Sequence, residues 1–194
     1  IAPMVETAYA LKKFIEAKTK THGSGDHQTE FLFNLETETT LQNLDEMAAV
    51  AKGNVDGVVF GRVDFTLSRG LPRGEINHPS ITEAVLKVAH ACVANDLELI
   101  VGGSVSVDAI AALREFRKVR LDRFETRKII FDGSAVDTDA IIAGIGNAVD
   151  FELDWLRSKR DYYAAIAQED APRITMMEKR AGQASTDASS PTSG

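Results

Sequence analysis

The amino-acid sequence predicts an α/β protein whose strands are parallel and covered by helices. Three observations support this fold class. Short runs rich in Val, Ile and Phe recur along the chain, the runs are apolar on both faces, and amphipathic stretches with helical periodicity separate or follow most of them. Strands buried on both faces, with helices between them, are typical of parallel sheets.

The elements follow from these patterns in chain order. The candidate strands are the five apolar runs at residues 1–5, 31–35, 57–61, 97–103 and 127–132. The spacing of apolar residues between and after them predicts helices over residues 7–19, 39–52, 80–96 and 105–117, the last with Ser106 as its N-cap.

The C-terminal part of the chain has a different character. A long helix is expected from Thr138 to about Arg180, with a break or a new start at Pro172 because proline interrupts helical hydrogen bonding. Residues 1–182 therefore form an α/β domain with a long helical segment, and the polar, low-complexity residues 183–194 form a tail that we expect to be disordered. The helix has more apolar side chains than it needs to cover one domain. They pack either on its own domain or on a partner subunit, and the sequence leaves both open.

Composition excludes several classes of protein. The 194 residues suffice for one domain with a substantial core, and the formal net charge of −7 argues against nucleic acid or an anionic membrane as a partner. No apolar run approaches the ~20 residues of a membrane span, and no signal peptide opens the chain. The single cysteine, Cys92, lies at helical spacing and is expected to be a buried structural thiol, which fits the reducing cytoplasm.

Two carboxylates follow the ends of consecutive candidate strands. Glu36 ends "FLFNLE" and Asp64 ends "GVVFGRVD", about one strand–helix–strand repeat later. Neighbouring parallel strands lie about 4.8 Å apart, so the two carboxylates should meet at the carboxyl-terminal edge of the sheet. Like charges this close share a proton or bind a cation, and two carboxylates with further positions open to water and substrate suit Mg²⁺ or Mn²⁺. The alternative is that each residue caps a helix or forms an ion pair.

The phrases "FNLETETTLQNLDEM" and "NVDGVVFGRVDFTLSRG" resemble the metal-binding core of the 4-hydroxy-2-oxoacid aldolase and citrate lyase family, in the phosphoenolpyruvate/pyruvate barrel superfamily. In that family one strand ends in Ile-Glu-Thr and the next in Gly-Pro-x-Asp, and the Glu and Asp bind the metal. The resemblance implies that Glu36 and Asp64 are the ligands of Mg²⁺ or Mn²⁺. It also implies a TIM-type (β/α) barrel from which about the first three strands are absent.

The sequence departs from the family pattern at several positions. Arg62 replaces the proline of the Gly-Pro-x-Asp turn, and it binds a substrate carboxylate or phosphate or pairs with an acid. Together with Gly61 and Val63, whose backbone is expected to approach the substrate, it is a candidate substrate-binding residue. The phrase "LDRFETRKIIFDGS" stands where the family has a Gly-Val-Asp turn, which leaves substrate choice open. No catalytic residue is assigned, because the motif of the family's acid–base histidine matches none of His22, His27, His78 and His90.

The resemblance implies a metal-dependent aldolase or lyase that cleaves a carbon–carbon bond of a 4-hydroxy-2-oxoacid to give pyruvate and an aldehyde. Its partners would be a small, pyruvate-like oxoacid and further copies of the same chain in a homo-oligomer. Two alternatives stay open. One is an acyl-CoA lyase of the citrate or malyl-CoA type, which would need a basic nucleotide-binding surface. The other is a catalytically incomplete barrel fragment that acts as an assembly module.

Overall fold

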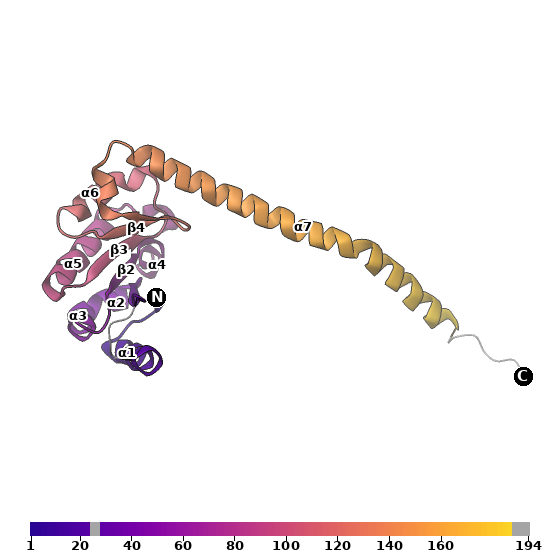
Figure 1. Ribbon diagram of the computed structural model, residues 1–194, viewed down its shortest axis with the longest axis horizontal. Coiled ribbons are helices and arrows are strands. Elements are labelled where there is room, and N and C mark those ends of the chain that lie inside the picture. The colour runs from indigo at the N-terminus through magenta and orange to yellow at the C-terminus, as the bar shows by residue number, and fades with distance from the viewer. Residues whose placement is uncertain (24–27, 188–194) are drawn as a thin grey trace, which may run out of the picture. The chain divides into compact units, whose positions relative to one another are not determined.

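The structure is a computed structural model that describes residues 1–23 and 28–187 (Figure 1). The chain forms two compact units, Ile1–Asp150 and Phe151–Gly194. The first unit holds the sheet and its covering helices, and the second consists of the greater part of the last helix.

The first unit is built on a five-stranded sheet with the strands in chain order. The first four strands are parallel to one another, and the fifth strand pairs with the fourth in the antiparallel direction. The strands are β1 (Leu32–Leu35), β2 (Gly57–Gly61), β3 (Glu98–Gly102), β4 (Arg123–Glu125) and β5 (Ile130–Asp132). The carboxyl ends of the four parallel strands therefore lie along one edge. The predicted α/β fold is confirmed, and the described residues supply fewer strands than the eight of a closed barrel.

Two of the predicted strands need correction. Of residues 1–5, only Ala2 pairs with the sheet, in an isolated parallel bridge to Phe33. The pairing stops there because Met4, the next residue that would bond β1, has a left-handed backbone with φ of 52° and donates its N–H to Oε1 of Glu36 instead. Residues 127–132 contain β5, which is antiparallel. The fourth parallel strand is β4, which no apolar run predicted because its sequence is Arg-Phe-Glu.

Helices follow the strands mostly as predicted. They are α1 (Ala8–His22), α2 (Glu38–Gln42), α3 (Leu44–Ala51), α4 (Arg62–Ser68), α5 (Pro79–Asn95) and α6 (Ile110–Arg117). The stretch 39–52 forms two helices because Asn43 leaves the helical conformation and donates its side-chain amide to the carbonyl of Glu6, at 2.8 Å. Ser106 precedes a short 3₁₀ helix, Val107–Ala109, and makes no capping bond there. Helix α4 was not predicted.

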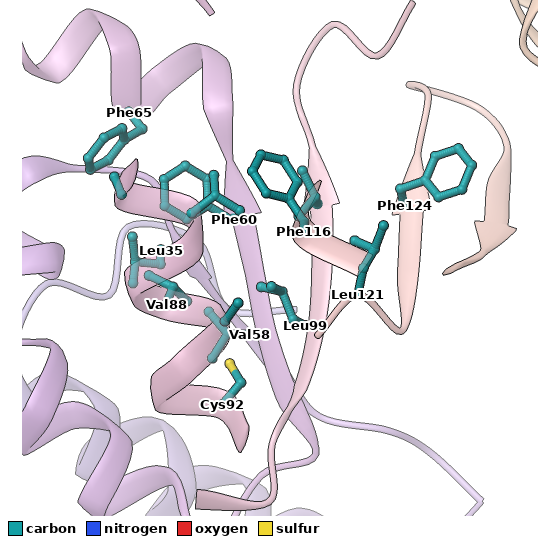
Figure 2. Close-up of a cluster of buried hydrophobic side chains, with 14 of the residues drawn as sticks. Leu35, Val58, Phe60, Phe65, Val88, Cys92, Leu99, Phe116, Leu121 and Phe124 are labelled. Atoms are coloured by element: carbon teal, nitrogen blue, oxygen red, sulfur yellow. The ribbon is translucent and has the colours of Figure 1, made fainter. Parts of the chain in front are cut away.

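One face of the sheet packs against the helices. The strand side chains on this face alternate with those on the other, and Figure 2 shows them interleaved with side chains from the covering helices. The strand residues of this cluster are Phe33, Leu35, Val58, Phe60, Leu99, Val101 and Phe124. Cys92 lies in the same cluster, and burial raises the pKa of its thiol to about 12. The predicted structural role of this cysteine is therefore confirmed.

The opposite face of the sheet carries a smaller buried cluster made by Leu32, Val59 and Ile100. Because side chains alternate along a strand, Asn34, Gly61 and Gly102 come next on this face, toward the carboxyl-terminal edge. Toward the edge where the candidate site lies, this face therefore changes from bulky apolar side chains to one amide and two glycines, which leave space.

Helix α7 (Ile141–Asp187) begins in the first unit, where Ile141, Ile145 and Ala148 are buried. It continues through Pro172, so the predicted break is wrong. The surrounding residues are exposed, so water can bond the carbonyl that loses its N–H partner. Residues 183–187 of the predicted tail are helical, and residues 188–194 lie outside the described residues.

None of the helices in the described part of the chain combines the length and apolar character of a membrane span.

Candidate functional site

A cavity of about 340 Å³ opens at the carboxyl-terminal edge of the sheet. Its walls come from the ends of all four parallel strands and from the loops and helix that follow them. The lining residues are Ile1, Pro3, Asn34, Glu36, Val59, Gly61, Val63, Asp64, Gly102, Gly103 and Glu125. Four of the five residues predicted for the site are in this set, and Arg62 is not.

Glu36 follows the last residue of β1 and is 5% exposed. Its Oε1 accepts the backbone N–H of Met4 at 2.9 Å, and its Oε2 accepts the side-chain amide of Asn34 at 3.1 Å. No Lys, Arg or His of the described residues forms an ion pair with it. A buried carboxylate held by two neutral donors keeps acceptor capacity on both oxygens.

The end of β2 is shaped to receive this carboxylate. A Cβ atom on Gly61 would lie 3.0 Å from Cβ of Glu36 and 3.2 Å from its Oε2. A side chain at this position would push against Glu36. The sequence predicted that Gly61 permits a close approach, and the group that approaches it in the structure is Glu36.

Asp64 lies in the first turn of α4 and is exposed. Its side chain has no hydrogen bond or ion pair with the described residues. The helix caps are other residues, because Thr37 caps α2 with its hydroxyl and Gly61 precedes α4. The alternative in which Glu36 and Asp64 are caps or ion-paired residues is therefore wrong for the described chain.

The donor set fits a hard divalent cation. Besides the two carboxylates, the side-chain oxygen of Asn34 is buried and has no hydrogen-bond partner in the described structure. Carboxylate and amide oxygens are the ligands that Mg²⁺ and Mn²⁺ prefer. No group of three or more His, Cys, Asp and Glu residues suited to a metal occurs in the described chain. Two carboxylates and one amide oxygen are thus the candidate ligands among the described residues that line this cavity.

Arg62 has a different environment from the predicted one. Its side chain is 1% exposed, and its guanidinium donates to the carbonyls of Gly102 and Gly103, at 3.2 and 2.9 Å, and to Oδ1 of Asn77, at 3.0 Å. Burial lowers its pKa to about 10. It forms no ion pair with an acid of the described residues, so that alternative is wrong. Arg62 instead ties the loop after β3 to the start of α4.

Gly103 makes this contact between loop and helix possible. Its φ is 87°, and a Cβ atom there would lie 2.7 Å from the backbone nitrogen of Val63 and 2.9 Å from that of Arg62. Only glycine adopts this backbone conformation and fits this space at little cost. The two walls of the cavity are therefore packed backbone to backbone.

Two lining residues with polar side chains, Asn34 and Glu125, were missed by the prediction. Asn34 stands two residues before Glu36 on the same face of its strand, and this spacing was the available signal. Glu125 ends β4, and a carboxylate after a buried Phe124 was the only hint of a strand end there. Burial raises the pKa of the Glu125 carboxyl. None of the three described histidines lines the cavity: His78 caps α5, His90 is exposed on that helix, and His22 contacts Phe31. His27 lies outside the described residues.

A parallel sheet with its polar residues gathered at the carboxyl-terminal edge is the architecture of (β/α)-barrel enzymes. The family model for HpcH/HpaI aldolase/citrate lyase matches residues 1–122. The chain therefore belongs to the HpcH/HpaI aldolase/citrate lyase family. No curated protein sequence matches it as a relative.

Solved structures agree on the fold. A citrate lyase from Burkholderia xenovorans LB400 superposes with a TM-score of 0.52 at 19% identity, over 74% of this chain and 47% of that one. RipC from Yersinia pestis superposes with a TM-score of 0.51 at 17% identity, over 75% of this chain and 60% of that one. An HpcH/HpaI aldolase/citrate lyase family protein from Burkholderia cenocepacia J2315 gives 0.51 at 15% identity, over 80% and 63%. The chain thus spans less than two-thirds of the length of each.

Proposed function

We propose that this chain binds Mg²⁺ or Mn²⁺ through Glu36 and Asp64, and that the full-length protein cleaves a carbon–carbon bond of a 4-hydroxy-2-oxoacid to give pyruvate and an aldehyde. One observation supports this most strongly. A buried carboxylate without a cation and an unpaired carboxylate line one cavity in a chain of a lyase family. A buried carboxylate with a second carboxylate in the same cavity lowers the stability of the fold unless a cation binds between them.

Each residue has a distinct task in this proposal. Glu36 is held in one orientation by Met4 and Asn34 and presents its free acceptor positions to the cavity. Asp64 is unconstrained and exposed, so it can adjust as a ligand arrives. Val59 and Val63 give the cavity an apolar wall for the carbon chain of the substrate. The bound cation would act as a Lewis acid that stabilises the enolate of pyruvate.

The size and charge of the cavity favour a small oxoacid over an acyl-CoA. About 340 Å³ is near the lower limit for ligand pockets. Within the described chain, no Lys, Arg or His side chain lines it, so nothing there would bind the phosphates of coenzyme A. These two features support the aldolase proposal over the acyl-CoA alternative.

Calorimetric titration with Mn²⁺ tests the metal site. We expect Glu36→Gln and Asp64→Asn each to weaken Mn²⁺ binding by at least about tenfold, since even groups that only support a ligand typically contribute 10- to 100-fold. Matched controls are Glu46→Gln and Asp45→Asn on the exposed side of α3, which should bind as the native chain does. Equal affinity in all five proteins would refute the site.

The reaction is tested on the full-length protein by coupling pyruvate release to lactate dehydrogenase. Turnover of a 4-hydroxy-2-oxoacid should require Mg²⁺ or Mn²⁺ and stop when EDTA removes the metal. A protein that binds Mn²⁺ and releases no pyruvate would retain the metal site and refute the reaction.

We further propose that α7 joins copies of this chain into a homo-oligomer. Its apolar side chains after Asp150 are exposed in the described residues, and clusters of this kind mark interaction surfaces. They include Leu153, Trp155, Leu156, Tyr162, Tyr163 and Ile166.

Light scattering tests this assembly. Trp155→Glu combined with Tyr163→Glu should lower the mass of the full-length protein and leave its circular dichroism unchanged. The control, Ser158→Glu combined with Gln168→Glu, adds the same charge to polar positions of the helix and should keep the native mass. An unchanged mass in the first variant would show that α7 does not hold the oligomer together.

A further inference from the structure

Glu125 is a third carboxylate of the cavity. It is the last residue of β4, so it stands at the carboxyl-terminal edge as Glu36 and Asp64 do. Phe124 points into the helix-covered core, and the alternation of side chains therefore puts Glu125 on the face that carries Asn34 and Gly61. It reaches the site from the side opposite β1.

The neighbouring strand leaves room for this side chain. The pairing of β3 with β4 sets Val101 against Phe124, and Gly102 is the next residue of β3. A Cβ atom on Gly102 would lie 2.7 Å from Oε1 of Glu125 and 3.1 Å from its Cγ. The carboxylate of Glu125 therefore lies over the end of β3, in space that any other residue at position 102 would fill.

Glu125 has no partner that fixes its charge. Its carboxylate forms no hydrogen bond or ion pair with the described residues, whereas Glu36 accepts two N–H groups. The charged groups that share its cavity are the carboxylates of Glu36 and Asp64, and no described Lys, Arg or His side chain lines it. The three acids do not form a cluster suited to one metal ion in the described chain. Glu125 is therefore beside the candidate metal site rather than part of it.

A half-buried carboxylate without a partner is suited to move protons. Burial raises its pKa, which brings the group closer to the range in which a side chain takes up and releases a proton near neutral pH. Cleavage of a 4-hydroxy-2-oxoacid needs such a group, because the proton of the 4-hydroxyl must leave as the aldehyde forms.

We propose that Glu125 accepts the proton of the substrate's 4-hydroxyl group and then delivers it to carbon 3 of the product. This inference rests on the proposed function. The oxygen at carbon 4 becomes the aldehyde carbonyl as the bond between carbons 3 and 4 breaks. The electron pair of the broken bond remains on the pyruvate fragment as the enolate. Glu125, now a carboxylic acid, protonates carbon 3 to form the methyl group of pyruvate and returns to the carboxylate. Nothing is oxidised or reduced.

Two reactions of the full-length protein with Mn²⁺ separate this role from general support of the site. Oxaloacetate also yields the enolate of pyruvate when it loses carbon dioxide, but it has no 4-hydroxyl proton to remove, and water can protonate carbon 3. Glu125→Gln should slow cleavage of a 4-hydroxy-2-oxoacid by about 10²- to 10⁴-fold and keep most of the oxaloacetate decarboxylation. Glu125→Asp should retain more cleavage than Glu125→Gln, and the control Glu83→Gln, exposed on α5, should match the native protein in both reactions.

A measurement without turnover accompanies the assay. Carbon-13 NMR of glutamate-labelled protein should show one carboxyl that titrates above the usual range, present in Glu83→Gln and lost in Glu125→Gln, while Mn²⁺ affinity is the same in both. Native-rate cleavage by Glu125→Gln, equal loss of both reactions, or the absence of that titration would overturn the role of Glu125. A native protein that cleaves no 4-hydroxy-2-oxoacid would instead overturn the proposed function, and the role of Glu125 with it.

Discussion

The two edges of the parallel sheet carry the same kind of acidic side chain in opposite environments. At the amino-terminal edge, Arg123 pairs with both Glu30 and Glu98, and Arg120 pairs with Asp122 at 2.8 Å. At the carboxyl-terminal edge, the acids that line the cavity form no ion pair with any described residue. Glu30, Glu98 and Asp122 at one edge are paired with arginines, and Glu36, Asp64 and Glu125 in the cavity at the other edge are not.

The difference does not arise from a lack of cations near the cavity. Arg62 follows the last residue of β2, at the same edge as Glu36, yet its guanidinium bonds backbone carbonyls and Asn77 instead. Glu36 therefore stays buried without a cationic partner among the described residues, although this arginine stands at the same edge. In the proposed function an external cation completes this site, and the metal-free chain bears the cost in stability.

The amino-terminal edge gives the larger expected effect on stability. Arg123→Met removes the cation between Glu30 and Glu98 and leaves two acids facing each other. We expect the free energy of unfolding to fall by about 1–2 kcal/mol, less than for a fully buried pair because water reaches all three side chains. Urea denaturation measures this effect at neutral pH.

The controls for this prediction are Arg123→Lys, which should keep part of the lost stability, and Arg127→Met, an exposed arginine of the neighbouring loop, which should cost little. If Arg123→Met proved as stable as the native chain, the pairing at this edge would contribute nothing, and the contrast between the two edges would lose its energetic meaning.

The sequence predicted one half of the cavity well and the other half poorly, for physical reasons. Glu36 and Asp64 were found because β1 and β2 are apolar runs whose ends can be located and whose spacing fixes their adjacency. Glu125 was missed because β4 is a three-residue strand with charged ends, which hydrophobic periodicity does not detect. The bonds of Arg62 depend on carbonyls some 40 positions away in the chain, and no local pattern encodes them.

The same limit applies to the fold. Helix α5 was predicted almost to the residue because its apolar face is long and regular. The division at Asn43 and the left-handed Met4 were not, because each depends on a tertiary hydrogen bond, to the carbonyl of Glu6 and to the carboxylate of Glu36 respectively. Elements set by local periodicity were predictable, and those set by contacts between distant segments were not.

The smaller expected effect is at the carboxyl-terminal edge and has the opposite sign. Burial raises the pKa of the Glu125 carboxyl, so the folded chain binds this proton more tightly than the unfolded chain does. The stability associated with this proton is fully present below the usual pKa of glutamate and is lost as the pH rises through the raised folded-state value. At neutral pH the ionised Glu125 therefore costs free energy, and Glu125→Gln should stabilise the chain by roughly 0.5 kcal/mol or less, because the side chain is only half-buried and water screens it.

Urea denaturation at neutral pH and again at about pH 4, near the usual pKa of glutamate, should show this gain shrinking with acidification. Glu83→Gln, an exposed control, should change stability at neither pH. A Glu125→Gln protein less stable than the native one at neutral pH would mean that the carboxylate has a favourable partner, and the cavity edge would then be no less neutralised than the other.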